Sequence, residues 1–512
     1  GGSNLIMKLT NLDIDAKLIA KLPLKFANRF KVIPVKEENG AIILAVTDKY
    51  NLQMLDEVRL IFGKVITPLE VPEEEINLAI KKHYGVGADT VARMLEESGV
   101  SLDRSGGSAG IEEIDETKLA QDASVIQFVN QLFLEALKER ATDIHLEPYE
   151  KELKVRFRVD GVLRDVPMPA ELKYFRGAIV SRIKIMSEMN IAERRLPQDG
   201  RIEIKTGGRQ IDCRVSVIPT LYGEGVVMRI LDKASILFGL EQLGMLPDTL
   251  KEFEKIITRP HGIFLVTGPT GSGKTTSLYT ALSTINAPDK KIITVEEPVE
   301  YHLEGINQIQ VNSKIGLSFA RGLRHILRHD PDVIMIGEIR DLETAEIAIR
   351  ASLTGHLVFA TLHTNDAAGA VTRLIDMGIE PYLVASSVIG IMAQRLVRVV
   401  CSSCGKPFSP DKVYLKDIRF ELKGTEKFMK GPGCEKCLNT GYYGRSGIYE
   451  LLSVNEQLKK LIMERSVTSS IKTLAREFGM RSLRDDGYEK VRLGFTTLDE
   501  VIKVTQEDET GE

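Results

Sequence analysis

The feature that most constrains this chain is a glycine-rich run, Gly268-Pro-Thr-Gly-Ser-Gly-Lys-Thr275, set between two patterns of regular structure. The apolar run at 263–267 indicates a buried parallel strand, and the sequence at 276–282 indicates a helix. A strand, a loop of this kind and a helix form a P-loop, whose backbone N–H groups converge on phosphate. A plain glycine turn would leave the lysine and threonine at the helix entrance unexplained. The run therefore predicts an α/β domain with a phosphate-bearing ligand.

The side chains of this loop are expected to divide the work of binding. The Lys274 ammonium should reach the β- and γ-phosphate oxygens, and the Thr275 hydroxyl should ligate Mg²⁺. The residues predicted to bind the nucleotide are Gly268, Thr270, Gly271, Ser272, Gly273, Lys274, Thr275 and Thr276.

Length and composition limit the classes of protein to which the chain can belong. At 512 residues it is too long for one hydrophobic core, so we expect about two to four domains. The net charge of −4 excludes a global basic field that would drive nonspecific nucleic-acid binding. No apolar run reaches the roughly 20 residues of a membrane span, and no secretory signal is visible. The opening Gly1-Gly-Ser-Asn is typical of a cloning remnant, so we expect the natural N-terminus to be missing.

The chain divides at composition breaks into successive modules. Residues 7–86 predict a small α/β module, with a strand at 41–46 and a helix at 73–84. Residues 87–115 are rich in glycine and serine, which predicts a flexible linker. Residues 116–236 predict a second module, and residues 237–512 alternate strand and helix in the manner of a parallel α/β domain.

The second module is expected to be an α+β domain. A helix should run from about 125 to 136, with Asp122 or Ser124 as its N-cap. Apolar and charged residues then alternate, which predicts an antiparallel sheet with one solvated face and a hairpin turn at Gly207-Gly208. The expected strands are 153–159, 201–205, 210–216 and 226–231.

In the parallel domain, three further strands end in reactive side chains. Glu296 and Glu297 follow the strand at 292–295, Glu338 follows 333–336, and His363 follows 357–361. Ligands of such sheets lie beyond the carboxyl ends of the strands. Phosphoryl transfer to water requires bound Mg²⁺, an oriented water and neutralised charge at the γ-phosphate, and these groups can supply all three.

Four of the five cysteines form two Cys-x-x-Cys pairs, and 29 residues separate the two pairs. This spacing predicts a structural zinc site with four thiolate ligands and no catalytic role, held in an insert at 398–440. A redox dithiol is the alternative, and Cys213 is expected to be a core residue. The predicted zinc ligands are Cys401, Cys404, Cys434 and Cys437.

Several segments together resemble one family. Glu338 and the strand before it resemble a Walker B segment, residues 293–300 an Asp box, 354–365 a His box, and 194–201 an arginine-bearing segment. Residues 10–505 are similar to the type II secretion and type IV pilus ATPases, above all to the pilus extension ATPases. The resemblance implies a RecA-like P-loop motor domain, preceded by an α+β PAS-like domain and a small N-terminal α/β domain.

The resemblance also implies roles for particular residues. Glu296 would orient or deprotonate the attacking water, Thr275 and Glu338 would hold Mg²⁺, and His363 would sense the γ-phosphate. The chain departs from the family at Glu297, where an aspartate is usual, so the role of Glu297 stays open.

The resemblance further implies a homo-hexamer in which an arginine from elsewhere completes each nucleotide site. Arg201 and Arg214 are the candidates, because both belong to neighbouring predicted strands and face the same way, with Arg194 and Arg229 behind them.

The expected activity is ATP hydrolysis coupled to mechanical work. The resemblance implies pilus assembly through an inner-membrane platform protein, by a cytoplasmic hexamer that is peripheral to the membrane. A type II secretion ATPase driving a pseudopilus shares every motif and remains the alternative. The negative net charge disfavours a DNA translocase, and we therefore expect no direct contact with nucleic acid. A scaffold that binds nucleotide without turnover is disfavoured by the intact Lys274, Glu296 and Glu338.

Overall fold

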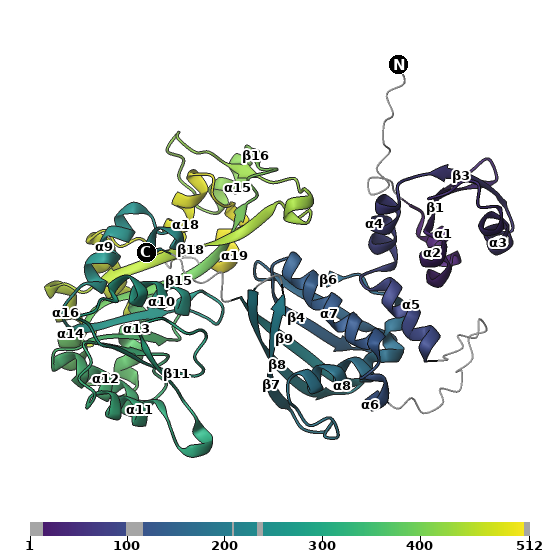
Figure 1. Ribbon diagram of the computed structural model, residues 1–512. Coiled ribbons are helices and arrows are strands. Elements are labelled where there is room, and N and C mark those ends of the chain that lie inside the picture. The colour runs from purple at the N-terminus through teal and green to yellow at the C-terminus, as the bar shows by residue number, and fades with distance from the viewer. Residues whose placement is uncertain (1–13, 99–115, 207–208, 233–238, 506–512) are drawn as a thin grey trace. The chain divides into compact units, whose positions relative to one another are not determined.

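The computed structural model describes residues 14–98, 116–206, 209–232 and 239–505 (Figure 1). The chain divides into two compact units, Gly1–Asp232 and Lys233–Glu512, which are treated separately below. The domain boundary predicted at 236 falls in the stretch 233–238, outside the described residues.

The first unit begins with a small α/β domain around a three-stranded sheet of order β1-β2-β3. Strands β1 and β2 are antiparallel, and β3 runs parallel to β2. Alternate residues of the strands, such as Ile42 and Leu44, are fully buried against the helices. The elements are α1 (Ala16–Lys21), α2 (Leu24–Phe30), β1 (Val32–Glu38), β2 (Ala41–Val46), α3 (Leu52–Phe62), β3 (Val65–Glu70) and α4 (Glu73–Tyr84).

The structure differs from the sequence prediction in the first part of the expected linker. Residues Ala88–Glu97 form helix α5, which buries Val91 and Met94 in the same core as α7 (Ala123–Lys138). The neighbouring glycine serves a close approach, because a Cβ at Gly85 would lie 2.6 Å from the carbonyl oxygen of Pro167. Glycine at this point therefore reflects close packing. The rest of the predicted linker, 99–115, lies outside the described residues.

The second part of this unit is the predicted antiparallel sheet, with strand order β6-β5-β4-β9-β8-β7. Burial alternates strictly along β5, so one face is apolar and the other polar. Helices α7 and α8 cover the apolar face. The turn predicted at Gly207-Gly208 is outside the described residues. The elements are α6 (Glu116–Leu119), β4 (Ala141–Pro148), β5 (Leu153–Val159), β6 (Val162–Val166), α8 (Arg176–Met186), β7 (Gln198–Thr206), β8 (Arg209–Thr220) and β9 (Gly223–Asp232).

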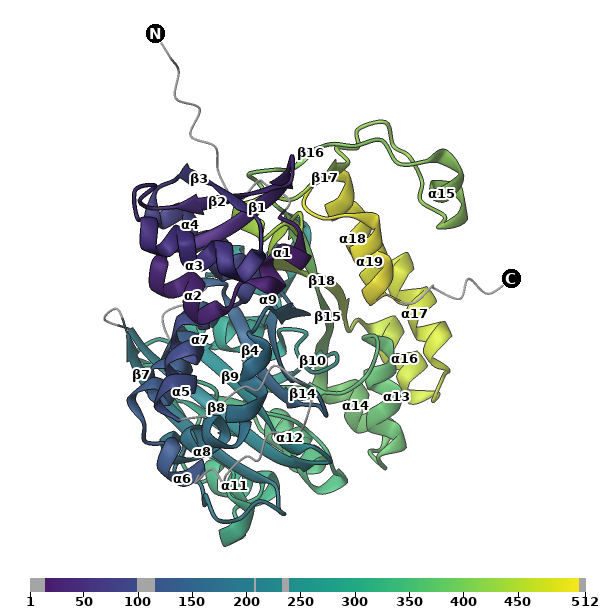
Figure 2. The same cartoon turned by 90° about the vertical axis from the view of Figure 1, so that its right-hand side faces the viewer.

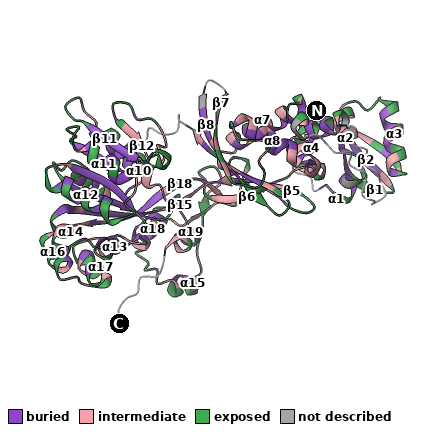
Figure 3. Cartoon of the chain, turned by 90° about the horizontal axis from the view of Figure 1, so that it is seen from below, coloured by how far each residue is buried: buried purple, intermediate pink, exposed green. Residues whose placement is uncertain are grey.

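The second unit is built on a seven-stranded sheet of order β12-β11-β13-β14-β10-β15-β18, as the parallel α/β prediction requires. All neighbouring strands are parallel except β18, which pairs antiparallel with β15. Every residue of the central strands β10, β13 and β14 is buried, because helices cover both faces (Figure 3). The strands are β10 (Gly262–Thr267), β11 (Ile292–Glu296), β12 (Asn307–Gln310), β13 (Val333–Ile336), β14 (Leu357–Leu362), β15 (Val388–Val400) and β18 (Tyr442–Ser453).

The helices of this unit separate into two layers. Helices α9 (Pro247–Ile257) and α10 (Lys274–Ile285) pack on one face of the sheet. Helices α11 (Phe319–Ile326), α12 (Leu342–Leu353), α13 (Ala368–Asp376) and α14 (Pro381–Ser387) pack on the other. Two hydrophobic cores therefore enclose the sheet.

The C-terminal part extends the second layer and carries the cysteine insert. Helices α16 (Glu456–Met463) and α17 (Thr468–Glu477) lie beside α14 and α13 (Figure 2). The insert contains α15 (Lys412–Asp417) and a short hairpin of β16 (Lys406–Pro407) and β17 (Met429–Lys430), and α18 (Leu483–Arg492) and α19 (Leu498–Val504) follow. Within the described ranges, no helix combines the length and the apolar character needed to cross a bilayer.

Candidate active site

The glycine-rich loop leaves β10, near the middle of the sheet, and enters the first turn of α10. Gly271 (φ 80°) and Gly273 (φ 90°) adopt left-handed backbone conformations that favour glycine. The Lys274 ammonium donates to the carbonyl oxygens of Gly268 at 2.8 Å and Pro269 at 3.1 Å. The lysine is thus folded over its own loop, with Thr275 and Thr276 in the same first turn.

The electrostatics of this loop favour an anion. Burial lowers the pKa of Lys274 to about 8, Glu338 opposes that shift, and Arg395 adds to it. Among the described residues, the buried hydroxyl of Ser272 has no hydrogen-bond partner. A phosphate would supply an acceptor to this hydroxyl and a counter-charge to the lysine, so the residues present fit a nucleotide phosphate.

Glu296 ends β11, Glu338 lies just after β13, and His363 lies just after β14. These strands are neighbours in the sheet, in the order β11-β13-β14-β10. His363 Nε2 lies 3.3 Å from the Glu338 carboxylate, whose side chain is 15% exposed. The Arg340 guanidinium pairs with Glu338 and, through its other nitrogen at 3.1 Å, with Glu297. Glu338 is therefore the carboxylate that contacts both His363 and Arg340 and acts electrostatically on Lys274.

Glu296 lies in a different environment from its neighbour Glu297. Glu296 is only 3% exposed and accepts hydrogen bonds from Tyr279, Thr294 and Gln308. Burial raises its pKa despite those three donors. The structure thus brings Glu338 and His363 together and sets Glu296 apart, under the P-loop helix.

Sequence reasoning missed several residues that fix this arrangement. The Thr267 hydroxyl, at the end of β10, contacts the Thr364 hydroxyl at 2.7 Å and accepts from the Thr364 N–H, which anchors the turn after His363 to the P-loop strand. The Gln394 side chain accepts from Ser277 of α10, and Arg395 donates to the carbonyl oxygen of Asn365 at 2.9 Å. Gln394 and Arg395 lie on β15, which is a direct neighbour of β10 in the sheet. The sequence alone does not reveal this, because it depends on the strand order.

The candidate arginines lie in the first unit, on the polar face of the antiparallel sheet. Arg201 of β7 is the cross-strand partner of Arg214 of β8, which is in turn the partner of Arg229 of β9. The Arg229 guanidinium donates to the nearly buried Asp143 at 2.9 Å. Cations directly opposite one another repel, and Asp143 supplies a carboxylate to this row of arginines.

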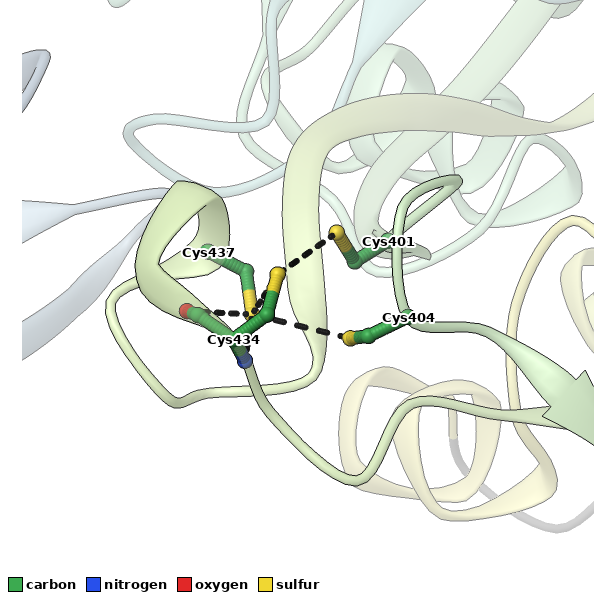
Figure 4. A group of neighbouring side chains, drawn as sticks. All are labelled: Cys401, Cys404, Cys434 and Cys437. Atoms are coloured by element: carbon green, nitrogen blue, oxygen red, sulfur yellow. Dashed lines mark hydrogen bonds between the residues drawn. The ribbon is translucent and has the colours of Figure 1, made fainter. Parts of the chain in front are cut away.

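The four predicted zinc ligands form a compact cluster, with all four sulfurs within 4.8 Å of one another (Figure 4). Neighbouring sulfurs are separated by 3.7, 3.8 and 3.9 Å. A tetrahedral zinc with Zn–S bonds of about 2.3 Å places its sulfurs about 3.8 Å apart. The cluster therefore fits Zn²⁺, whereas a disulfide needs an S–S distance of about 2.05 Å.

Backbone donors support a thiolate at one position of this cluster, Cys437, whereas burial raises the pKa of Cys404. Burial opposes ionisation of Cys437, but the N–H groups of Cys434 and Gly441 donate to its sulfur and lower its pKa to about 6. Anionic sulfur is the form that binds zinc.

The fold and the site define the class of this protein: a RecA-like α/β ATPase with a P-loop beside the centre of a parallel sheet. The chain belongs to the family of type II/IV secretion system proteins, whose family model matches residues 118–503. A second family model, the MshEN domain, matches residues 6–90.

Individual relatives agree with this membership. The type II secretion system protein E of Xanthomonas campestris pv. campestris is 47% identical over 490 residues, which cover 95% of this chain and 85% of that protein. The type IV pilus assembly ATPase PilB of Myxococcus xanthus is 45% identical over 507 residues, 98% of this chain and 89% of that protein. The solved ATPase DotB of Yersinia pseudotuberculosis shares the fold, with a TM-score of 0.55 and 22% identity over 74% of this chain and 93% of that chain.

Proposed function

We propose that this protein is a hexameric motor that hydrolyses Mg²⁺-ATP to power assembly of a type IV pilus through an inner-membrane platform protein. The observation that carries the proposal is that Glu338, whose carboxylate lies 3.3 Å from His363 Nε2, also acts electrostatically on Lys274 of the glycine-rich loop. The likeness to a pilus assembly ATPase over 98% of the chain supports the pilus as the product.

Each residue of the site has a place in the proposed reaction. The backbone of 268–273 and the Lys274 ammonium hold the phosphates, and the oxygens of Thr275 and Glu338 are ligands of the kind that Mg²⁺ prefers. The bound cation would neutralise phosphate charge. Glu296 acts on the attacking water, and His363 senses the γ-phosphate.

We further propose that the site is completed by Arg201 and Arg214 from the antiparallel domain, acting between subunits of the hexamer. Their adjacent positions on β7 and β8 give a paired cation that suits the charge of a transferring phosphoryl group. The role of the cysteine cluster is structural: a zinc ion closes the insert and takes no part in hydrolysis. The hexamer is cytoplasmic and peripheral to the inner membrane.

Type II secretion is the second candidate, because the relative from Xanthomonas is the type II secretion protein E at 47% identity. The test is deletion of the gene in its own host, with pilus number and secreted enzyme activity measured side by side. Loss of pili with normal secretion supports pilus assembly, and the opposite result moves the assignment to secretion. Complementation by the wild-type chain is the control.

The motor itself is tested with the purified full chain. Mg²⁺-dependent ATPase activity should rise with the fraction of protein at the mass of a hexamer. The proposal fails if no ATP is hydrolysed at any oligomeric mass. Strong stimulation by DNA, with none by the platform protein, would favour the DNA translocase.

A further inference from the structure

The carboxylate of Glu296 is held by donors from three separate elements. Its Oε2 accepts from the Tyr279 hydroxyl of α10. Its Oε1 accepts from the Thr294 hydroxyl of β11 at 2.5 Å and from Gln308 Nε2 of β12 at 3.1 Å. Both oxygens are therefore engaged, and the group is fixed in one orientation beneath the surface of the site.

The Tyr279 hydroxyl is itself held in place. It accepts from the Glu300 N–H at 3.3 Å, and its ring packs edge-to-face on Tyr301 at 5.3 Å. Gln308, which like Tyr279 donates a hydrogen bond to Glu296, also donates to the Tyr301 carbonyl at 2.9 Å. Tyr279 thus joins the carboxylate after β11 to the segment that follows it.

Tyr279 lies on α10, so its contact with Glu296 joins that carboxylate to the helix that follows the glycine-rich loop. Lys274 begins α10, and Tyr279 lies five residues further along the same helix. Strand β11 is three strands away from β10, about 14 Å across the sheet, so Glu296 has no direct contact with the P-loop through the strands. The Tyr279 hydroxyl is the described contact through which the P-loop helix reaches Glu296.

We propose that Tyr279 is a positioning residue for hydrolysis: its hydroxyl sets the orientation of the Glu296 carboxylate and couples it to the P-loop helix. This inference rests on the proposed ATPase function.

The test is Tyr279→Phe in the full chain, which keeps the ring that packs on Tyr301 and removes only the hydroxyl. We expect kcat for ATP to fall about 10- to 100-fold while the affinity for ATP stays within about twofold. The matched control is Tyr488→Phe, since Tyr488 is a buried tyrosine of the same unit that donates to the Ile418 carbonyl at 3.0 Å. That control should keep kcat within about twofold.

Two further measurements distinguish the positioning of Glu296 by Tyr279 from a merely structural role of Tyr279. In a Glu296→Gln background, Tyr279→Phe should change kcat by no more than about twofold, because its effect acts through Glu296. The acid limb of the kcat profile should move to higher pH in Tyr279→Phe, because a buried carboxylate that also faces Glu300 has lost a donor. An undiminished fall in the Glu296→Gln background, or an equal fall in Tyr488→Phe, would overturn the inference.

Should Tyr279→Phe fail to fold, Gln308→Leu removes another donor to Glu296 and carries the same three expectations. Failure of the proposed function is distinguishable, since the wild-type chain would then hydrolyse no ATP. An active wild type with an unaffected Tyr279→Phe contradicts the positioning role alone.

Discussion

The Lys274 ammonium donates to the Gly268 carbonyl oxygen at 2.8 Å, so the lysine that should bind phosphate covers its own loop. Its pKa is lowered to about 8, chiefly by burial. A nucleotide must displace this contact, and only the protonated lysine gains a charge-assisted bond by doing so.

ATP binding should weaken as the pH rises above about 8. The ligand-free lysine loses its proton there, and binding must then restore it, so the affinity should fall by up to about tenfold per pH unit. The measurement is ATP affinity between pH 7 and pH 9.5. In Lys274→Arg the charge persists over this range, so its affinity, whatever its level, should not vary. An equal pH slope in both proteins would contradict the prediction.

Glu338→Gln should lower kcat by about 10²–10⁴-fold while ATP still binds. Glu338 acts on Lys274 and contacts His363 and Arg340, whereas the ion pair of Glu297 among the described residues is with Arg340. Glu297→Gln is therefore the matched control, and its kcat should change by less than about fivefold. Steady-state turnover and oligomeric mass are the measurements. The prediction is wrong if the two variants lose activity equally.

Arg201→Ala should abolish turnover, by about 10³–10⁵-fold, without loss of ATP binding or of the hexamer. Arg201 pairs across the sheet with Arg214, and the charge of both would be needed at the phosphoryl group. Arg195→Ala is the control, because Arg195 is 88% exposed and pairs with Glu193 two residues before it. Full turnover in Arg201→Ala would remove Arg201 from the site.

The freshly reduced protein should contain one zinc per chain. Cys437→Ser, which removes one of four clustered sulfurs, should release the metal and lower the melting temperature. Cys213→Ser is the control, since Cys213 is buried in the first unit and should leave the zinc content unchanged. Metal analysis and thermal melts test this, and a wild-type protein without zinc refutes it.

Much of the architecture could be predicted from the sequence because it depends on local patterns. The apolar strand at 263–267 and the alternating strand at 153–159 appear as expected. A strand that is buried on both faces has a continuous apolar run, and a strand that is buried on one face alternates apolar and polar residues. The linker expected at 87–115 begins instead with helix α5 at 88–97, because Val91 and Met94 pack into the core around α7. Only a long-range contact reveals the difference.

The sequence by itself indicated the glycine-rich loop and each of the two Cys-x-x-Cys pairs, because each needs particular residue types at short spacing. Tertiary structure decided which strand-end groups meet. The strand order β11-β13-β14-β10 departs from chain order and brings His363 beside Glu338. It also separates two adjacent carboxylates: Glu296 is buried under Tyr279, and Glu297 pairs with Arg340. Neighbouring residues of an extended chain point to opposite sides, and only the packing of the sheet determines what each side contains.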